Sequence, residues 1–168
     1  MTEDATAVLA RIVESATGVD LRGGGSGERS VTLVGRDGEK GPVERLPSLL
    51  TDARSVVGVV PRIESALADR LTAADAPADA RIVLTGRAGE RLTGPARPAI
   101  RSALAGHGVD LYTHQGDSPV GVLLVDDHAV VGLFDGPTLA AVLTTDHPSV
   151  REWAAATFQR YREAADAV

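Results

Sequence analysis

Apolar residues alternate with polar turns along most of the chain, in blocks whose lengths predict an ordered series of strands and helices. Short apolar runs that are rich in β-branched residues and end at glycine, proline or a charged residue predict strands. They cover Ser30–Gly35, Ser55–Val60, Arg81–Thr85 and Val109–His114. A longer run, Gly121–Phe134, has two apolar halves around Asp127–His128 and predicts a β-hairpin with a tight turn.

Segments with apolar residues at helical spacing separate these strands. The predicted helices are Ala5–Ser15, Pro42–Ala53, Arg62–Ala74, Pro98–Gly106 and Pro148–Ala165. Aspartates precede the first and the last of them, so Asp4 and Asp146 are candidate N-caps. The pattern leaves Pro137–Thr144 ambiguous.

The terminal helix is expected to be firmly anchored, because it holds three of the five aromatic residues of the chain. Its apolar stripe consists of Val150, Trp153, Ala154, Thr157, Phe158 and Tyr161.

This order of elements predicts the α/β class: a layered mixed sheet with flanking helices, a C-terminal β-hairpin and a closing helix. The early strands are expected to be parallel, and the hairpin makes the sheet mixed. Three parts are predicted along the chain: an N-terminal helix in residues 1–22, a flexible glycine-rich linker in 23–30 and a single α/β domain in 31–168.

Composition limits the function classes. The chain has 168 residues, no cysteine and a net charge of −6, so thiolate zinc sites, cysteine nucleophiles and a basic DNA-binding surface are excluded. Lys40 is the one lysine, and this preference for arginine suits a GC-rich genome and a salt-rich cytoplasm. Because the start lacks a signal-peptide pattern and no apolar run is long enough to span a bilayer, a cytoplasmic location without a membrane partner is expected.

The familiar catalytic and cofactor motifs are absent from the sequence. The cluster Gly23–Gly27 precedes a strand instead of opening a helix, so it is interpreted as a linker and not as a phosphate loop. No serine lies in a G-x-S-x-G elbow, and no two histidines have the i, i+4 spacing of a zinc site. We therefore expect no catalytic residue, metal or cofactor.

The best candidates for ligand binding follow predicted strands. Arg62 and Arg87 each follow a predicted strand after one intervening residue. Ligands of open α/β sheets bind at such strand ends, and two arginines there can hold a phosphate or carboxylate. His114 and His128 lie at strand ends and, with Asp126 or Asp127, are a candidate histidine–carboxylate cluster. The alternatives are surface salt bridges for the arginines and solvated turns for the other three residues.

Two motifs in the second half of the chain carry a resemblance to known proteins. They are the "v-x-DD-x-x-v-x-l" hairpin at Val125–Leu133 and the "D-x-x-v-x-x-W…f…y-r" closing helix at Asp146–Arg162. With the preceding strand–helix–strand unit, residues 55–165 resemble the effector domains of archaeal transcription regulators. These include the TrmB-type sugar sensors, the related methanogen-type regulators and the haloarchaeal TbsP family.

The resemblance implies a phospholipase D-like half-fold with a sensing role. Enzymes of that fold use an H-x-K motif, but here His114 is followed by Gly116 and His128 by Val130, so the catalytic version is excluded. The regulators of these families also carry a winged-helix DNA-binding domain, which this sequence does not show. We therefore expect either an excised domain or a standalone relative, with DNA contacted only through a separate winged-helix domain.

Three functional hypotheses follow. The first is a regulatory sensor that forms a homodimer and binds a small anionic metabolite or a partner protein near Arg62, Arg87, His114, Asp126 and His128. The second is a small hydrolase or transferase that uses His114, His128 and Asp126. The third is an interaction module without a small ligand.

Overall fold

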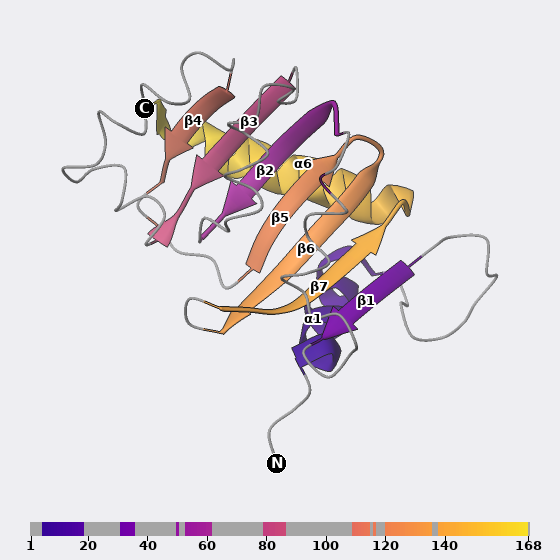
Figure 1. The fold of residues 1–168 in the computed structure, drawn as a ribbon. Coiled ribbons are helices and arrows are strands. Elements are labelled where there is room, and N and C mark those ends of the chain that lie inside the picture. The colour runs from indigo at the N-terminus through magenta and orange to yellow at the C-terminus, as the bar shows by residue number, and fades with distance from the viewer. Residues whose placement is uncertain are drawn as a thin grey trace.

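A computed structural model gives the fold of the chain, drawn as a ribbon in Figure 1. It describes residues 5–18, 31–35, 50, 53–61, 79–86, 109–114, 116, 120–135 and 138–167. The helices and strands within these residues are α1 (Ala5–Thr17), β1 (Val31–Gly35), β2 (Ser55–Val60), β3 (Asp79–Leu84), β4 (Val109–Thr113), β5 (Val120–Val125), β6 (His128–Asp135), β7 (Thr138–Thr145), α6 (Pro148–Glu163) and β8 (Asp166–Ala167).

The strands form one mixed sheet with the order β1-β7-β6-β5-β2-β3-β4-β8. Strands β2, β3 and β4 are parallel to one another, and every other neighbouring pair is antiparallel. The predicted class, a layered mixed sheet with a C-terminal hairpin and a closing helix, is confirmed. Strand β2 has the predicted bounds, and β5 and β6 form the predicted hairpin.

Several local predictions are corrected. The first strand, β1, does not join the parallel group: it pairs antiparallel with β7 at the sheet edge. The ambiguous segment 137–144 forms most of β7. The hairpin turn is Asp126–Asp127 instead of Asp127–His128, because His128 already pairs with Val125. The predicted linker and the three predicted helices between β1 and β4 lie wholly or mostly outside the described residues.

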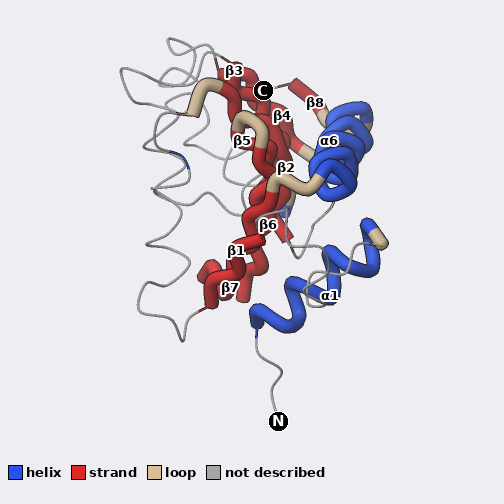
Figure 2. Tube along the Cα trace, turned by 90° about the vertical axis from the view of Figure 1, so that its right-hand side faces the viewer, coloured by secondary structure: helices blue, strands red, loops and turns tan. Residues whose placement is uncertain are grey.

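Helices α1 and α6 cover the same face of the sheet, as Figure 2 shows. Leu9 and Val13 of α1 and Val150 and Ala154 of α6 share one buried cluster with residues of β5, β6 and β7. Phe158 of α6 packs farther along the sheet with Val57, Val59 and Val83. The opposite face carries its own buried cluster, which includes Val56, Ile82, Leu84 and Leu123. Because both faces are buried, β2 is apolar at almost every position.

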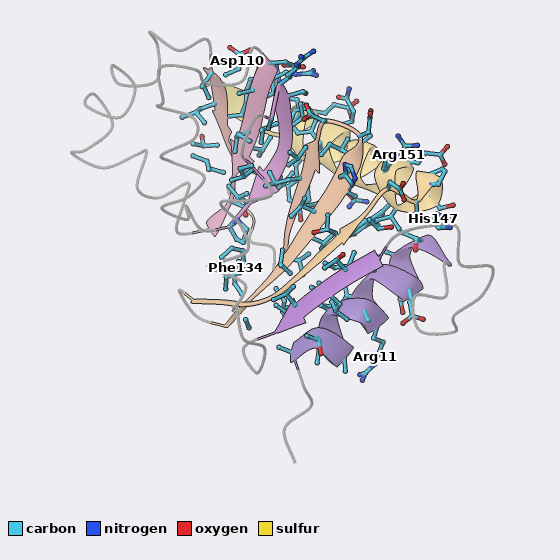
Figure 3. The ribbon with its side chains drawn as sticks, turned by 45° about the vertical axis from the view of Figure 1, so that its right-hand side comes forward. Arg11, Asp110, Phe134, His147 and Arg151 are labelled. Atoms are coloured by element: carbon cyan, nitrogen blue, oxygen red, sulfur yellow. The ribbon has the colours of Figure 1, made fainter. Side chains whose placement is uncertain are left out.

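The predicted stripe of α6 is largely confirmed. Val150, Ala154, Thr157 and Phe158 are buried, and Trp153 and Tyr161 are half-buried. The predicted cap is wrong: His147, not Asp146, is the N-cap, and its Nδ1 accepts a hydrogen bond of 3.2 Å from the Ser149 N–H. Pro148 then begins the helix, where its missing N–H removes no helical hydrogen bond. His147 and the nearby Arg151 are labelled in Figure 3.

The cap gives a first prediction. His147→Ala removes the acceptor of the Ser149 N–H and is expected to lower the free energy of unfolding by about 1 kcal/mol, the usual cost of a lost N-cap. His147→Asp restores an acceptor at the same place and should recover most of that loss. Urea denaturation followed by circular dichroism measures both values. Equal stability of the wild type and His147→Ala contradicts the capping role.

Candidate ligand site

The carboxyl ends of the three parallel strands lie side by side at one edge of the sheet. Val60 pairs with Leu84, and Leu84 pairs with Thr113. The hydrogen bonding continues one residue farther, because the Thr85 N–H donates to the Val60 carbonyl (3.1 Å) and the His114 N–H to the Leu84 carbonyl (2.9 Å). We call Pro61, Thr85, Gly86, His114 and Gly116 the carboxyl edge. Ligands of open α/β sheets bind outside such an edge.

A tight backbone connection closes the carboxyl edge between β3 and β4. The Gly86 N–H donates to the Gly116 carbonyl at 2.9 Å. Gly86 has a φ of 53°, in the left-handed region that costs glycine nothing and other residues about 1 kcal/mol or more. The chain can therefore turn sharply directly after Thr85.

His114 is half-buried at this edge and held by two contacts. Its Nδ1 accepts a hydrogen bond of 2.8 Å from the Gly116 N–H, which requires Nδ1 to be unprotonated. A neutral ring then carries its proton on Nε2, which becomes a hydrogen-bond donor. The ring packs edge-on against Tyr161 of α6, with 4.9 Å between centroids and an angle of 65°. His114 is thus a fixed, oriented donor between the sheet and α6.

Two arginine side chains of α6 lie over aromatic rings near the outer part of β4. The Arg162 guanidinium lies over the Tyr112 ring at 3.9 Å, and that of Arg160 lies over the Tyr161 ring at 5.9 Å. Arg62 follows Pro61 in the chain and Arg87 follows Gly86, but both lie outside the described residues. That Arg62 and Arg87 bind a ligand stays a prediction. The ends of β2 and β3, from which they continue, lie side by side.

Asp126 and His128 lie at the opposite edge. Asp126 precedes the β6 strand and is level with Ser55, the first residue of β2. Asp126 lies three strands away from His114 and six residues away along the strand direction. The distance between the two residues is therefore roughly 25 Å. In Figure 3, Asp110 lies near the edge that holds Asp126, and Phe134 lies near the carboxyl edge. The predicted cluster of His114, His128 and Asp126 therefore does not form, and one small ligand cannot contact all five predicted residues.

Asp126 has a structural role instead. Its Oδ1 accepts hydrogen bonds of 3.0 Å from the backbone N–H groups of Arg54 and Ser55, and its own N–H donates to the Ser55 carbonyl. These bonds fasten the β5–β6 turn to the start of β2. His128 is exposed and pairs with Val125 through its backbone.

The described part of the chain offers no obvious metal site or membrane helix. No group of three or more histidines, aspartates and glutamates lies close enough to hold a metal ion there. None of the helices in that part is long and apolar enough to cross a membrane.

Sequence reasoning missed Thr85 and Tyr161 at the carboxyl edge. Thr85 is completely buried, and its Oγ1 has no hydrogen-bond partner among the described residues. The sequence predicts Tyr161 only as part of the apolar stripe of the last helix, yet its ring packs against that of His114. A threonine at a strand end and a tyrosine in a helix are common, so neither carries a sequence signal of its own.

Solved structures place this architecture among phospholipase D-like folds. The chain is similar to Nuc from Salmonella typhimurium, a phospholipase D family member, with a TM-score of 0.63 and 19% identity over 84% of this chain and 99% of that one. NucT from Helicobacter pylori matches with a TM-score of 0.54 and 13% identity, over 84% of this chain and 100% of that one. The predicted phospholipase D-like fold is confirmed.

A chromatin protein also shares the fold, and a family model matches most of the chain. TrmBL2, an archaeal chromatin protein, matches with a TM-score of 0.57 and 18% identity, over 82% of this chain and 53% of that one. The family model described as "Methanogenesis regulatory protein FilR1, middle domain" matches residues 40–164, and the chain belongs to this family. No curated protein sequence matches. The chain thus belongs to a domain family of regulatory proteins, which agrees with the coarser part of the resemblance.

Proposed function

We propose that this regulatory domain senses a small anionic ligand at the carboxyl edge and performs no chemistry on it. The observation that carries the proposal is the alignment of the ends of β2, β3 and β4, where His114 presents a fixed Nε2 donor. Arg62 and Arg87 continue directly from two of these ends. Two arginines and an imidazole donor suit a carboxylate or a phosphate.

The histidines support a non-catalytic role. A general acid or base needs a ring nitrogen free to exchange a proton, usually beside an orienting partner. In His114 the basic lone pair is that of Nδ1, which already accepts a hydrogen bond from the Gly116 N–H, so the ring can take up a proton only by losing that bond. No histidine in the sequence is followed two residues later by lysine, the arrangement of the phospholipase D enzymes that the fold resembles.

In this proposal the domain acts on DNA indirectly. The net charge of −6 disfavours contact with phosphates, so DNA is contacted through a separate winged-helix domain. Such regulators read two half-sites with paired subunits, and we therefore expect a homodimer. The narrower relationship to TrmB-type or TbsP regulators belongs to this proposal as well.

The arginines provide the test. Purified protein is screened by thermal shift against phosphorylated sugars, nucleotides and carboxylic acids, where a ligand at a hundred times its Kd adds about 2.7 kcal/mol to the free energy of unfolding. Arg62→Ala combined with Arg87→Ala should abolish the rise in Tm. Arg54→Ala is the matched control, because Arg54 is exposed at the opposite edge, and it should leave the rise intact.

Two results contradict the proposal. If an anion stabilises the double variant as strongly as the wild type, the anion binds elsewhere. If no anion in the screen raises the Tm of the wild type, the domain is better explained as a protein-interaction module.

A further inference from the structure

Three polar side chains are buried among the described residues, and all three are threonines: Thr85, Thr145 and Thr157. The hydroxyl of Thr145 has a partner, since it accepts a hydrogen bond of 3.1 Å from the His147 N–H. The hydroxyls of Thr85 and Thr157 have none within the described part of the chain, although the residues are 0% and 6% exposed. Buried hydroxyl groups normally form hydrogen bonds, so the two hydroxyls without a partner need an explanation.

Thr85 faces α6. Side chains alternate between the two faces of a strand, and on β3 Val83 packs with Phe158 of α6 whereas Ile82 and Leu84 pack on the far side. The hydrogen bonds that extend β2, β3 and β4 by one residue keep this alternation going to Thr85 and His114. Thr85 is therefore the neighbour of His114, on the face where the His114 ring meets Tyr161.

Thr157 lies on the side of α6 that faces the carboxyl edge. Residues four apart on a helix lie one above the other, so Thr157 shares its side with Tyr161, which contacts His114. Phe158 lies on the adjacent side and reaches toward Arg81, nearer the start of β3. Figure 1 shows α6 crossing the sheet from the end of β7 to β4.

We propose that Thr85, Thr157 and the Nε2 of His114 form a subsite for a neutral, hydroxyl-bearing part of the ligand, between α6 and the carboxyl edge. Each threonine hydroxyl both donates and accepts a hydrogen bond, and the imidazole donates one, which matches the groups of an alcohol. A charged group would be disfavoured between two uncharged buried hydroxyls. The inference rests on the proposed function, in which Arg62 and Arg87 hold the anionic part.

The subsite has a consequence for the ligand-free protein that can be measured without knowing the ligand. An unpartnered buried hydroxyl contributes nothing to stability, so its replacement by a methyl group of the same shape is neutral or stabilising. Thr85→Val and Thr157→Val should therefore leave the Tm unchanged or raise it. Thr145→Val, the matched control, should lower the Tm because the His147 N–H loses its acceptor.

The second measurement tests binding with defined probes. Isothermal titration calorimetry compares glycerol 3-phosphate, inorganic phosphate and glycerol on the wild type, on the double variant Thr85→Val/Thr157→Val and on Arg62→Ala/Arg87→Ala. The wild type should bind glycerol 3-phosphate at least about tenfold more tightly than phosphate, since hydrogen bonds to the alcohol add to the anion contacts. The threonine double variant should lose that ratio and keep its affinity for phosphate.

The possible failures are separable. If phosphate and glycerol 3-phosphate bind the arginine variant as well as the wild type, the proposed function fails. If they bind neither protein, the subsite for a hydroxyl-bearing phosphate ligand is overturned. If the wild type prefers glycerol 3-phosphate and the threonine double variant keeps the preference, or if the wild type shows no preference, the subsite is overturned while the anion site stands. A fall in Tm for Thr85→Val as large as for Thr145→Val also overturns it, because the Thr85 hydroxyl is then already bonded.

Discussion

Gly58→Ala is expected to lower the free energy of unfolding by at least about 3 kcal/mol, the largest effect of any change proposed for this domain. Gly58 lies in the middle of β2, between Ile82 of β3 and Leu123 of β5. A Cβ there would overlap the Val122 carbonyl oxygen and come within 2.8 Å of the Cα of Leu123. Both obstacles are backbone, so β5 would have to move away from β2 at the centre of the sheet.

Gly121→Ala is the matched control for this change. Gly121 is buried on β5, next to β2, but a Cβ there meets its nearest atoms, in Phe134 and Pro61, at 3.4 and 3.5 Å, which is ordinary van der Waals contact. Its stability should therefore change by less than about 1 kcal/mol, partly because alanine loses less chain entropy than glycine on folding. Urea denaturation compares the two variants, and equal losses would mean that the close approach of β2 and β5 is not what makes Gly58 necessary.

The local apolar pattern is sufficient to predict most strands of this fold, although not β7 or the short β8. The run SVVGVV, ended by Pro61, predicts the bounds of β2 because a strand buried on both faces needs an apolar residue on each. The terminal helix is equally clear, since Pro148 marks its start and Val150, Ala154 and Phe158 its buried side. In both cases the information lies within a few neighbouring residues.

The hairpin turn is misplaced by one residue for a long-range reason. Asp126 has a φ of 52°, a left-handed conformation that a two-residue hairpin turn requires at its first central position. Its side chain is held there by the N–H groups of Arg54 and Ser55, which are 72 and 71 residues away in the chain. No local pattern contains that contact.

Strand order also decides which candidate residues meet. The sequence places His114 and Asp126 at strand ends, but β5 runs antiparallel to β2, so its end lies level with the start of the parallel strands. Likewise, the sequence does not reveal which buried threonine has a partner. Thr145 and Thr85 both lie at the ends of apolar segments, and only the packed structure gives one of them an N–H donor. The sequence therefore predicts that the candidate site lies at strand ends, but not which residues form it.

Asp126→Ala should lower the free energy of unfolding by about 2 kcal/mol, the second-largest effect among these variants. The change removes two hydrogen bonds between a carboxylate and backbone N–H groups, each worth less than usual because the site is exposed, and leaves alanine in a left-handed conformation. Asp126→Gly relieves the backbone strain but not the lost bonds, so it should recover about half. Asp126→Asn keeps a side-chain oxygen and tolerates the conformation, so it should lose the least.

Asp127→Ala is the control in the same turn. Asp127 is exposed, its φ is not left-handed, and its side chain has no bonding partner within the described residues, so its replacement should change stability by less than about 0.5 kcal/mol. Urea denaturation gives the ranking, and hydrogen exchange of the Arg54 and Ser55 amides locates the effect, since both should exchange faster in Asp126→Ala alone. If those amides remain protected in Asp126→Ala, they do not depend on this carboxylate, and the fastening of the β5–β6 turn to β2 must come from the backbone bond between Asp126 and Ser55.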